Sequence, residues 1–334
     1  MEILPQISEI IQTTILPLCP LQKRNRLLQG IRLFGLHPFT SLNSSGRLLT
    51  PNRKTGESYV YRLLRDCTLR KLFLRIFWTC FLKKKTLFLS LDFTDINAQL
   101  QLACLALTTF NGRALPLWVK ACDKRPKKGT MIRDLVKMLK EFLRYRNPNT
   151  ELVICMDRWF HSPRLLRFLH ARKITFICRM KSNIHVFVPW RDELTEVGEV
   201  SRPETRILHR GMHVRLILSK WKPSMKGEEP WFLITNDQER PREEILRLYR
   251  KRFEIEELFK DIKWVQRYEW VQVKTKEVLE SLVSFIMFGW WILYEVRKKV
   301  HVPWENKKQR LSWFRGMWEI LARERFYLVY HPSN

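Results

Sequence analysis

Short apolar segments follow one another in a definite order through the middle of the chain, and that order leaves few folds open. Residues 87–92, 100–110 and 113–121 have the composition of β-strands, and the Asn111-Gly112 pair predicts a tight hairpin between the last two. Two amphipathic helices and two further short strands then alternate, over residues 131–145, 152–156, 162–171 and 174–178. This β-β-β-α-β-α-β order predicts an α/β fold in which an antiparallel meander leads into parallel strands.

The segments on either side of this core have other patterns. Residues 59–82 predict one basic amphipathic helix, residues 183–235 a series of short strands, and residues 241–263 one long periodic helix. The longest uncharged apolar run, residues 281–294, is shorter than the ~20 residues that a bilayer span needs. We therefore expect this run to form a buried core helix.

Lysine and arginine are in large excess. The chain has 61 Lys and Arg against 33 Asp and Glu, a net charge of +28, while 45% of its residues are hydrophobic. So much apolar material predicts a folded protein, and so much positive charge indicates a polyanionic partner, with nucleic acid first and an anionic membrane surface second. Neither of the glycine-rich phosphate-binding motifs is present, which argues against dinucleotide enzymes and P-loop NTPases. The 7 cysteines show no C-x-x-C spacing, which favours a reducing cytosol over a disulfide framework.

Two aspartates lie where predicted strands end. Asp92 ends the first predicted strand, and Asp157 ends the first strand that we expect to be parallel. Carboxylates at the ends of neighbouring strands can converge, because ligands of open sheets gather outside the carboxyl ends of the strands. The alternative for each is an exposed aspartate that caps a strand end.

A second polar group lies on the long helix predicted over residues 241–263. At 100° per residue, four side chains fall within about 60° of arc, beside the apolar face. They are Tyr249, Arg252, Glu256 and Lys263. A carboxylate, two cations and a phenol in one stripe suit phosphoryl transfer on a polynucleotide, whereas a simple salt bridge along the helix explains Arg252 and Glu256 only. The acidic residues of the far side, which we expect to be solvated, are Glu254, Glu257 and Asp261.

Three motifs resemble those of a known family. The spacing Tyr249-x2-Arg252-x3-Glu256-x6-Lys263 resembles the signature of bacterial insertion-sequence DDE transposases of the "insertion sequence four" type. Leu-Asp-Phe-Thr-Asp at 91–95 resembles that family's first aspartate motif, and Met-Asp-Arg-Trp-Phe at 156–160 resembles its second. The motifs come in the family's order. One position departs from the pattern, because Trp159 stands where the family usually has glycine.

The resemblance implies a ribonuclease-H-like catalytic core with a β-rich insertion, flanked by helical N- and C-terminal regions. It implies that Asp92, Asp157 and Glu256 are the catalytic residues and hold two Mg²⁺ ions, for which Mn²⁺ can substitute. In resembling transposases an aromatic residue of the insertion stacks on a flipped base, and a core role is the alternative for Trp231. The residues that the resemblance places against DNA are Tyr249, Arg252, Lys263, Trp231 and Arg158.

The implied activity is strand cleavage at transposon ends followed by strand transfer to target DNA. The implied partners are these DNAs and a second copy of the chain in the DNA complex, without a membrane, in the bacterial cytoplasm at the nucleoid. The corresponding division of the chain is a DNA-binding region at 1–85, the first part of the core at 86–182, the β-rich insertion at 183–236, the glutamate-bearing core helix at 237–266 and a helical C-terminal region at 267–334.

Alternatives stay open at this point. A catalytically inactive or domesticated DNA-binding protein that kept the transposase fold is the second reading, because a bulky Trp159 beside Asp157 can disturb the site. A membrane-surface protein is the third, and the short apolar run counts against it. Asp95 is the rival for the first aspartate. His209-x3-His213 has zinc-like spacing but no cysteine pair nearby, so we do not expect a zinc site.

Overall fold

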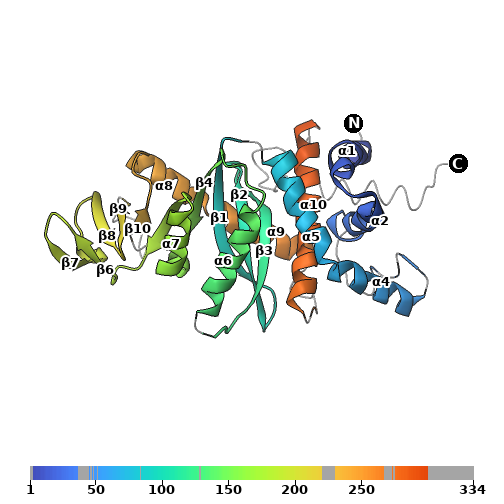
Figure 1. The fold of residues 1–334 in the computed structure, drawn as a ribbon, viewed down its shortest axis with the longest axis horizontal. Coiled ribbons are helices and arrows are strands. Elements are labelled where there is room, and N and C mark those ends of the chain that lie inside the picture. The colour runs from blue at the N-terminus through green and yellow to red at the C-terminus, as the bar shows by residue number, and fades with distance from the viewer. Residues whose placement is uncertain are drawn as a thin grey trace.

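The strands of the core and of the insertion join into one continuous sheet. The computed structural model describes residues 3–36, 45, 47, 49–50, 52–82, 84–127, 129–219, 230–266, 273 and 275–299, and in them the sheet has 10 strands. Their bounds are β1 (Thr86–Asp95), β2 (Leu100–Thr108), β3 (Ala114–Asp123), β4 (Glu151–Met156), β5 (Thr175–Met180), β6 (His185–Val188), β7 (Glu193–Glu196), β8 (Glu204–His209), β9 (Met212–Leu218) and β10 (Phe232–Thr235). They lie in the order β3-β2-β1-β4-β5-β10-β9-β8-β6-β7 (Figure 1).

The predicted meander and the predicted parallel strands are both present, which confirms the α/β class. β1 pairs antiparallel with β2, and β2 pairs antiparallel with β3. On its other side β1 pairs parallel with β4, and β4 pairs parallel with β5. The crossovers are α6 (Thr130–Leu143) and α7 (Pro163–Ala171), which lie on the same face of the sheet (Figure 1). Helix α6 buries the apolar side that its spacing predicts, namely Leu135, Met138, Leu139 and Phe142.

The insertion extends the core sheet instead of forming a sheet of its own. β6 to β9 continue beyond β5, and β10 brings the chain back between them and β5. In this return strand, Phe232 lies opposite Met180 of β5 on one side and opposite Leu218 of β9 on the other. β10 therefore delivers the two helices that follow, α8 (Arg242–Lys251) and α9 (Glu254–Gln266), to the parallel part of the sheet.

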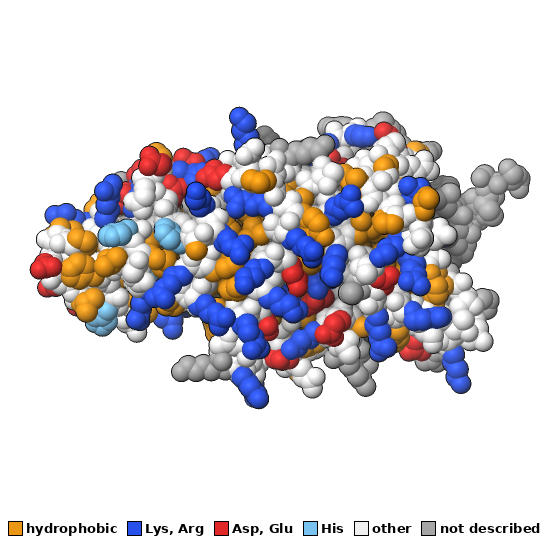
Figure 2. Space-filling view, viewed as in Figure 1, with side chains coloured by type: hydrophobic (Ala, Val, Ile, Leu, Met, Phe, Trp, Pro, Cys, Tyr) orange, Lys and Arg blue, Asp and Glu red, His pale blue; other side chains and the backbone are white. Residues whose placement is uncertain are grey.

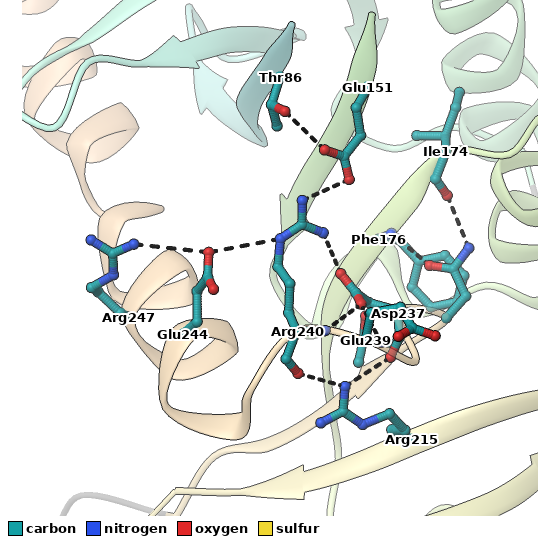
Figure 3. Close-up of polar contacts among 12 residues, drawn as sticks. Thr86, Glu151, Ile174, Phe176, Arg215, Asp237, Glu239, Arg240, Glu244 and Arg247 are labelled. Atoms are coloured by element: carbon teal, nitrogen blue, oxygen red, sulfur yellow. Dashed lines mark hydrogen bonds and ion pairs between the residues drawn. The ribbon is translucent and has the colours of Figure 1, made fainter.

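A cluster of charged side chains holds the segment after β10 near the start of β4 (Figure 3). Asp157 follows the other end of that strand. Arg240 donates to Glu151, the first residue of β4, with 2.6 Å between Nη2 and Oε1, and it also pairs with Asp237. Arg215 of β9 donates to the backbone carbonyl oxygens of Asp237 and Arg240 at 3.0 and 2.8 Å. This cluster is consequently an anchor between the core and the insertion.

Helix α10 (Lys276–Lys299) forms the core between the sheet and the N-terminal helices. It packs against β3 on one side and against α1, α4 and α5 on the other. In the part of the chain that the structure describes, it is the one helix long and apolar enough to cross a membrane, but 89% of its apolar window is buried inside the protein. The prediction of a buried core helix is confirmed. The remaining helical segments are α1 (Ile3–Ile10), η1 (Ile11–Ile15), η2 (Leu16–Leu18), α2 (Leu21–Gly30), η3 (Ile31–Gly35), α4 (Arg53–Arg65), α5 (Cys67–Ile76), η4 (Phe77–Phe81), η5 (Arg158–Phe160) and η6 (Val197–Glu199).

Two local features set the arrangement of these helices. The prediction of a single helix over residues 59–82 is wrong. The side chain of Asp66 accepts a hydrogen bond from the Thr68 N–H at 3.1 Å, and this contact caps the start of a new helix, α5. Helix α2 approaches α10 closely at Gly30, where a Cβ would lie 2.0 Å from the ring of Phe285. Residues 300–334 of the predicted C-terminal region lie outside the described residues.

Candidate active site

Asp92 lies on β1, and Asp157 directly follows β4, the neighbouring parallel strand. Parallel pairing between β1 and β4 ends at Leu91 and Met156, so the two aspartates are the next residue of each strand. The expectation that β1 ends at Asp92 is wrong, because its antiparallel partner β2 continues and holds β1 in the sheet as far as Asp95. The adjacency of the two carboxylates follows from the shared register of the parallel strands.

Two stacked aromatic rings hold this end of the strands together. Phe93 and Phe160 stack with 4.9 Å between ring centroids and 7° between ring planes, and Phe160 is fully buried. The backbone N–H of Phe93 donates to Asp92 Oδ1 at 2.8 Å. Phe160 ends η5, the single turn that begins directly after Asp157. The stack therefore fixes the backbone beside both aspartates.

The helix that carries Glu256 is broken next to the site. A continuous helix was predicted over residues 241–263, but α8 ends at Lys251 and α9 begins at Glu254. Between them the backbone makes tight i to i+3 hydrogen bonds, from Arg252 N–H to the Tyr249 carbonyl at 3.0 Å and from Ile255 N–H to the Arg252 carbonyl at 3.1 Å. A turn of this type is narrower than an α-helical turn, and Arg252 is only 5% exposed within it.

Arg252 joins the first aspartate to the glutamate. Its Nη1 lies 2.7 Å from Asp92 Oδ2, and its Nη2 lies 2.9 Å from Glu256 Oε1. Among the described residues its buried Nε has no hydrogen-bond partner. Burial lowers the pKa of this guanidinium, but Tyr249 and the surrounding carboxylates outweigh burial and raise it. Arg252 is therefore a fixed positive charge between two carboxylates.

The third carboxylate, that of Asp157, lies near Tyr249. The hydroxyl oxygen of Tyr249 lies 3.5 Å from Asp157 Oδ1, a long contact, and burial raises the pKa of this phenol, which stays protonated. Burial also raises the pKa of Asp92, against the effect of Arg252, and the nearby charges of Asp157 and Glu256 raise it further. The three carboxylates are thus close enough to repel one another, with Arg252 as their common counter-ion.

Comparison with known families covers this whole region. The family described as "Transposase DDE domain" matches residues 88–292, a range that contains Asp92, Asp157 and Glu256. The chain belongs to the DDE transposase family. No curated protein matches the sequence. Membership implies a DNA substrate and a nuclease-type enzyme of DNA recombination, and it does not favour the alternative of an inactive DNA-binding protein.

DDE transposases generally use divalent metal ions, so the three carboxylates can be compared with what such ions require. In the described part of this transposase no three acidic, histidine or cysteine side chains form a ready metal-binding group. Carboxylate oxygens are nevertheless the ligands that Mg²⁺ and Mn²⁺ prefer. Asp92 and Glu256 both pair with Arg252, and the charge of Asp157 acts on the same guanidinium. The residues fit a divalent ion if the Arg252 side chain moves away from Asp92 or Glu256 when the ion binds.

The other residues predicted to contact DNA lie on η5, on α9 and directly before β10. Arg158 is exposed in η5, directly after Asp157, and half-buried Lys263 lies on α9, two turns beyond Glu256. Trp231 is half-buried, and its ring packs edge-on against Tyr249 at 5.2 Å between centroids and against Phe253 at 6.1 Å. Trp231 thus packs against Tyr249, the residue whose hydroxyl lies near Asp157.

One residue that positions the site was not found from the sequence. Glu254 was expected to be solvated, but it is 5% exposed and accepts three backbone hydrogen bonds from the β2–β3 turn. The donors are the N–H groups of Thr109, Phe110 and Gly112, at 3.0, 3.1 and 3.1 Å. Asp261 is also buried, 2.8 Å from Arg113 Nε of the same turn. These contacts fix the start of α9, and with it Glu256, against the core meander.

The histidines singled out by their spacing do not lie together. His209 is buried and His213 is exposed on the next strand. The partner of His209 is His161, with 3.1 Å between the two Nε2 atoms. Burial, together with His209 and Arg210, lowers the pKa of His161 to about 4, and burial and Arg210 also lower the pKa of His209, so the pair is uncharged at neutral pH.

Proposed function

We propose that this protein is a DDE transposase of the "insertion sequence four" type that cleaves and joins DNA by metal-dependent phosphoryl transfer. The observation that carries the proposal is the pairing of Asp92 and Glu256 with one buried arginine, Arg252, beside Asp157. Asp157 directly follows the neighbouring parallel strand, lies 3.5 Å from the Tyr249 hydroxyl and adds its charge to the group. Family membership over residues 88–292 supports the same chemistry.

Asp92, Asp157 and Glu256 would hold two Mg²⁺ ions. When bound, such ions supply the charge that activates a water or a DNA 3′-hydroxyl and that stabilises the leaving oxygen. The transposase itself supplies the three carboxylates, each on a backbone segment fixed by packing: Asp92 and Asp157 by the Phe93–Phe160 stack, and Glu256 by the start of α9.

Arg252 has a positioning role in this proposal. Before metal and DNA are bound, its guanidinium offsets the repulsion between Asp92 and Glu256. With a cation held by the carboxylates, the guanidinium would be available to the phosphate oxygens of the DNA, which it can contact through two N–H groups. Tyr249, Lys263 and Arg158 would contact neighbouring phosphates.

The remaining parts of the proposal concern the assembly. Trp231 would meet the DNA at the edge of the site, supported from behind by Tyr249 and Phe253. A homodimer on DNA, a role of residues 1–85 in binding the transposon ends and association with the bacterial nucleoid follow from the same resemblance.

The bulk of Trp159 does not argue for an inactive protein. Its side chain is 72% exposed, while the next residue, Phe160, turns into the core and stacks on Phe93. The indole therefore lies outside the space that the carboxylates share.

The experiment that tests the proposal is strand cleavage by the purified full chain. The substrate is duplex DNA that carries the sequences found at both borders of the element encoding this gene, with scrambled duplex as the control. We expect nicking at the border with Mg²⁺ or Mn²⁺, and none with EDTA, because the carboxylates need an ion to act on a phosphodiester. Equal cleavage in EDTA, or equal cleavage of scrambled DNA, would contradict the proposal.

DNA binding should weaken steeply as salt increases. Lys and Arg side chains are spread along the face drawn in Figure 2, in keeping with the net charge of +28. Each neutralised phosphate contributes about −0.9 to the slope of log affinity against log salt, so six to ten contacts lower the affinity roughly 10³- to 10⁵-fold between 50 and 200 mM. Fluorescence anisotropy of a labelled duplex in EDTA measures the slope. A slope near zero would mean that the positive charge serves a partner other than DNA.

A further inference from the structure

A pocket lies next to η5, the turn that directly follows Asp157. Its volume is about 770 Å³, and it is lined by η5 on one side and by the turn after β5 on the other. The first wall carries Arg158 and Trp159, and the second carries Lys181, Ser182 and Asn183. The pocket thus combines two cations, one large aromatic ring and small polar groups, within one residue of a proposed metal ligand.

Trp159 is exposed because of the geometry of η5. In this single turn Phe160 occupies the buried side, and the preceding side chain is directed outward and is 72% exposed. Within the described part of the chain the indole makes no hydrogen bond and no ring contact. Trp190, the other exposed tryptophan among these residues, differs: its N–H donates to Thr205, and the guanidinium of Arg202 lies 3.9 Å above its ring. An indole without a partner inside the protein has a ring face on which a ligand ring can stack, and here it forms one wall of the pocket.

The opposite wall is held in place by the insertion. The carbonyl oxygen of Ser182 accepts a hydrogen bond from the Gly198 N–H at 2.8 Å, and that of Ile184 accepts one from the Val197 N–H at 2.9 Å. At the base, His161 is fixed by its contact with His209. The pocket is therefore formed without a ligand, and its size lies in the range of small-molecule sites.

We propose that this pocket binds one unpaired nucleotide of the DNA strand that passes Asp157. The base stacks on Trp159, and Arg158 and Lys181 neutralise the phosphates on either side of it. Stacking on an aromatic face together with a positive groove is how single strands are bound without sequence preference. The nucleotide must be unpaired, because a base inside the duplex already has both faces covered and cannot reach the indole.

This inference rests on the proposed function, since it takes DNA as the substrate. It assigns to Trp159, the residue that departs from the family's usual glycine, a contact with the substrate. The pocket requires neither metal nor cleavage to bind, so it can be tested separately from the chemistry.

The test compares two labelled probes in EDTA with the full-length protein: a blunt duplex, and the same duplex interrupted by a short unpaired thymidine tract. We expect the wild type to bind the tract probe more tightly, and Trp159→Ala to weaken that binding roughly tenfold without change on the blunt duplex. Trp159→Phe should keep most of the preference because a ring remains. Lys181→Gln should weaken binding of the tract probe and reduce its salt slope by about one. Trp190→Ala, the same substitution at an exposed site outside the pocket, should bind both probes as the wild type does.

A third probe, in which abasic sites replace the thymidines, separates stacking from phosphate contacts. We expect it to bind the wild type as weakly as the tract probe binds Trp159→Ala. Equal affinity for abasic and thymidine tracts, or a Trp159→Ala defect of the same size on blunt duplex, would overturn the assignment. If the protein prefers the tract probe but does not cleave border DNA, the pocket assignment holds and the proposed activity is refuted. If the protein binds no DNA at all, both are overturned.

Discussion

Glu256→Gln should abolish border cleavage, with a loss of at least roughly 10³-fold, equivalent to about 4 kcal/mol of transition-state stabilisation. The amide keeps the shape of the side chain but removes the negative charge that would hold a metal ion and that pairs with Arg252 at 2.9 Å. Binding of the border duplex in EDTA should change little, because binding depends on the phosphates and the basic surface. Single-turnover cleavage and anisotropy, measured on one preparation, separate the two effects.

The matched control is a substitution of Glu257, the next residue of the same helix. Glu257 is paired with Lys260 at 2.6 Å and with Arg113 at 3.3 Å, and its side chain is 36% exposed. Glu257→Gln removes an identical charge from α9 without touching the three carboxylates, so cleavage should stay within a few-fold of the wild type. Cleavage retained in Glu256→Gln, or lost equally in both variants, would refute the assignment of Glu256.

The same comparison settles which aspartate of β1 acts. Asp92 faces Arg252 in the site, whereas Asp95 is 61% exposed and pairs with Lys124 at 3.0 Å. We therefore expect Asp92→Asn to lose cleavage and Asp95→Asn to retain it. The reverse result would make Asp95 the first metal ligand.

The core of this fold is predictable from sequence because its determinants are local. Alternation within short apolar runs, the turn around Gly112 and the spacing of α6 each act over a few residues, and all three are present in the structure. The adjacency of Asp92 and Asp157 was also predictable, because neighbouring parallel strands bring their carboxyl ends to the same edge of the sheet.

The break between α8 and α9 was not predictable in this way. A periodic pattern of apolar residues continues through it, and no proline or glycine marks it. The turn is instead stabilised by tertiary contacts, chiefly the pairing of Arg252 with Asp92, which lies 160 residues earlier in the chain. The helical projection nevertheless placed Arg252 and Glu256 on one side, since both the α-helical and the tighter turn keep residues four apart close together.

The burial of Glu254 was missed for a similar reason. A helical wheel assigns the side opposite the main apolar face to solvent, but here the β2–β3 turn covers that side. Its N–H donors lie between 142 and 145 residues earlier in the sequence. No pattern within the helix indicates such an acceptor, and the left-handed backbone of Phe110 and Gly112 that aims the donors appears only in the folded chain.

Glu254→Ala should accordingly destabilise the protein by roughly 3 kcal/mol, far more than removal of the neighbouring charge of Glu257. The substitution leaves three N–H groups of the turn without their carboxylate, at a site where Glu254 is 5% exposed. Water can reach part of this turn, because Gly112 is exposed, and this keeps the cost below that of a fully buried ion. Urea unfolding followed by circular dichroism gives the free energy of unfolding for each variant.

Two further substitutions define the origin of the effect. Glu254→Gln keeps one carbonyl oxygen for Thr109 and Phe110 but turns an amide N–H₂ toward Gly112, so about half of the loss should remain. Glu257→Ala removes a half-exposed carboxylate whose partners Lys260 and Arg113 can be solvated instead, so it should cost at most about 0.5 kcal/mol. Cleavage by Glu254→Ala should fall even where the protein is fully folded, because the start of α9 sets the distance of Glu256 from Asp92. If Glu254→Ala and Glu257→Ala are equally stable and equally active, the turn does not position the catalytic helix, and its contacts with Glu254 are incidental.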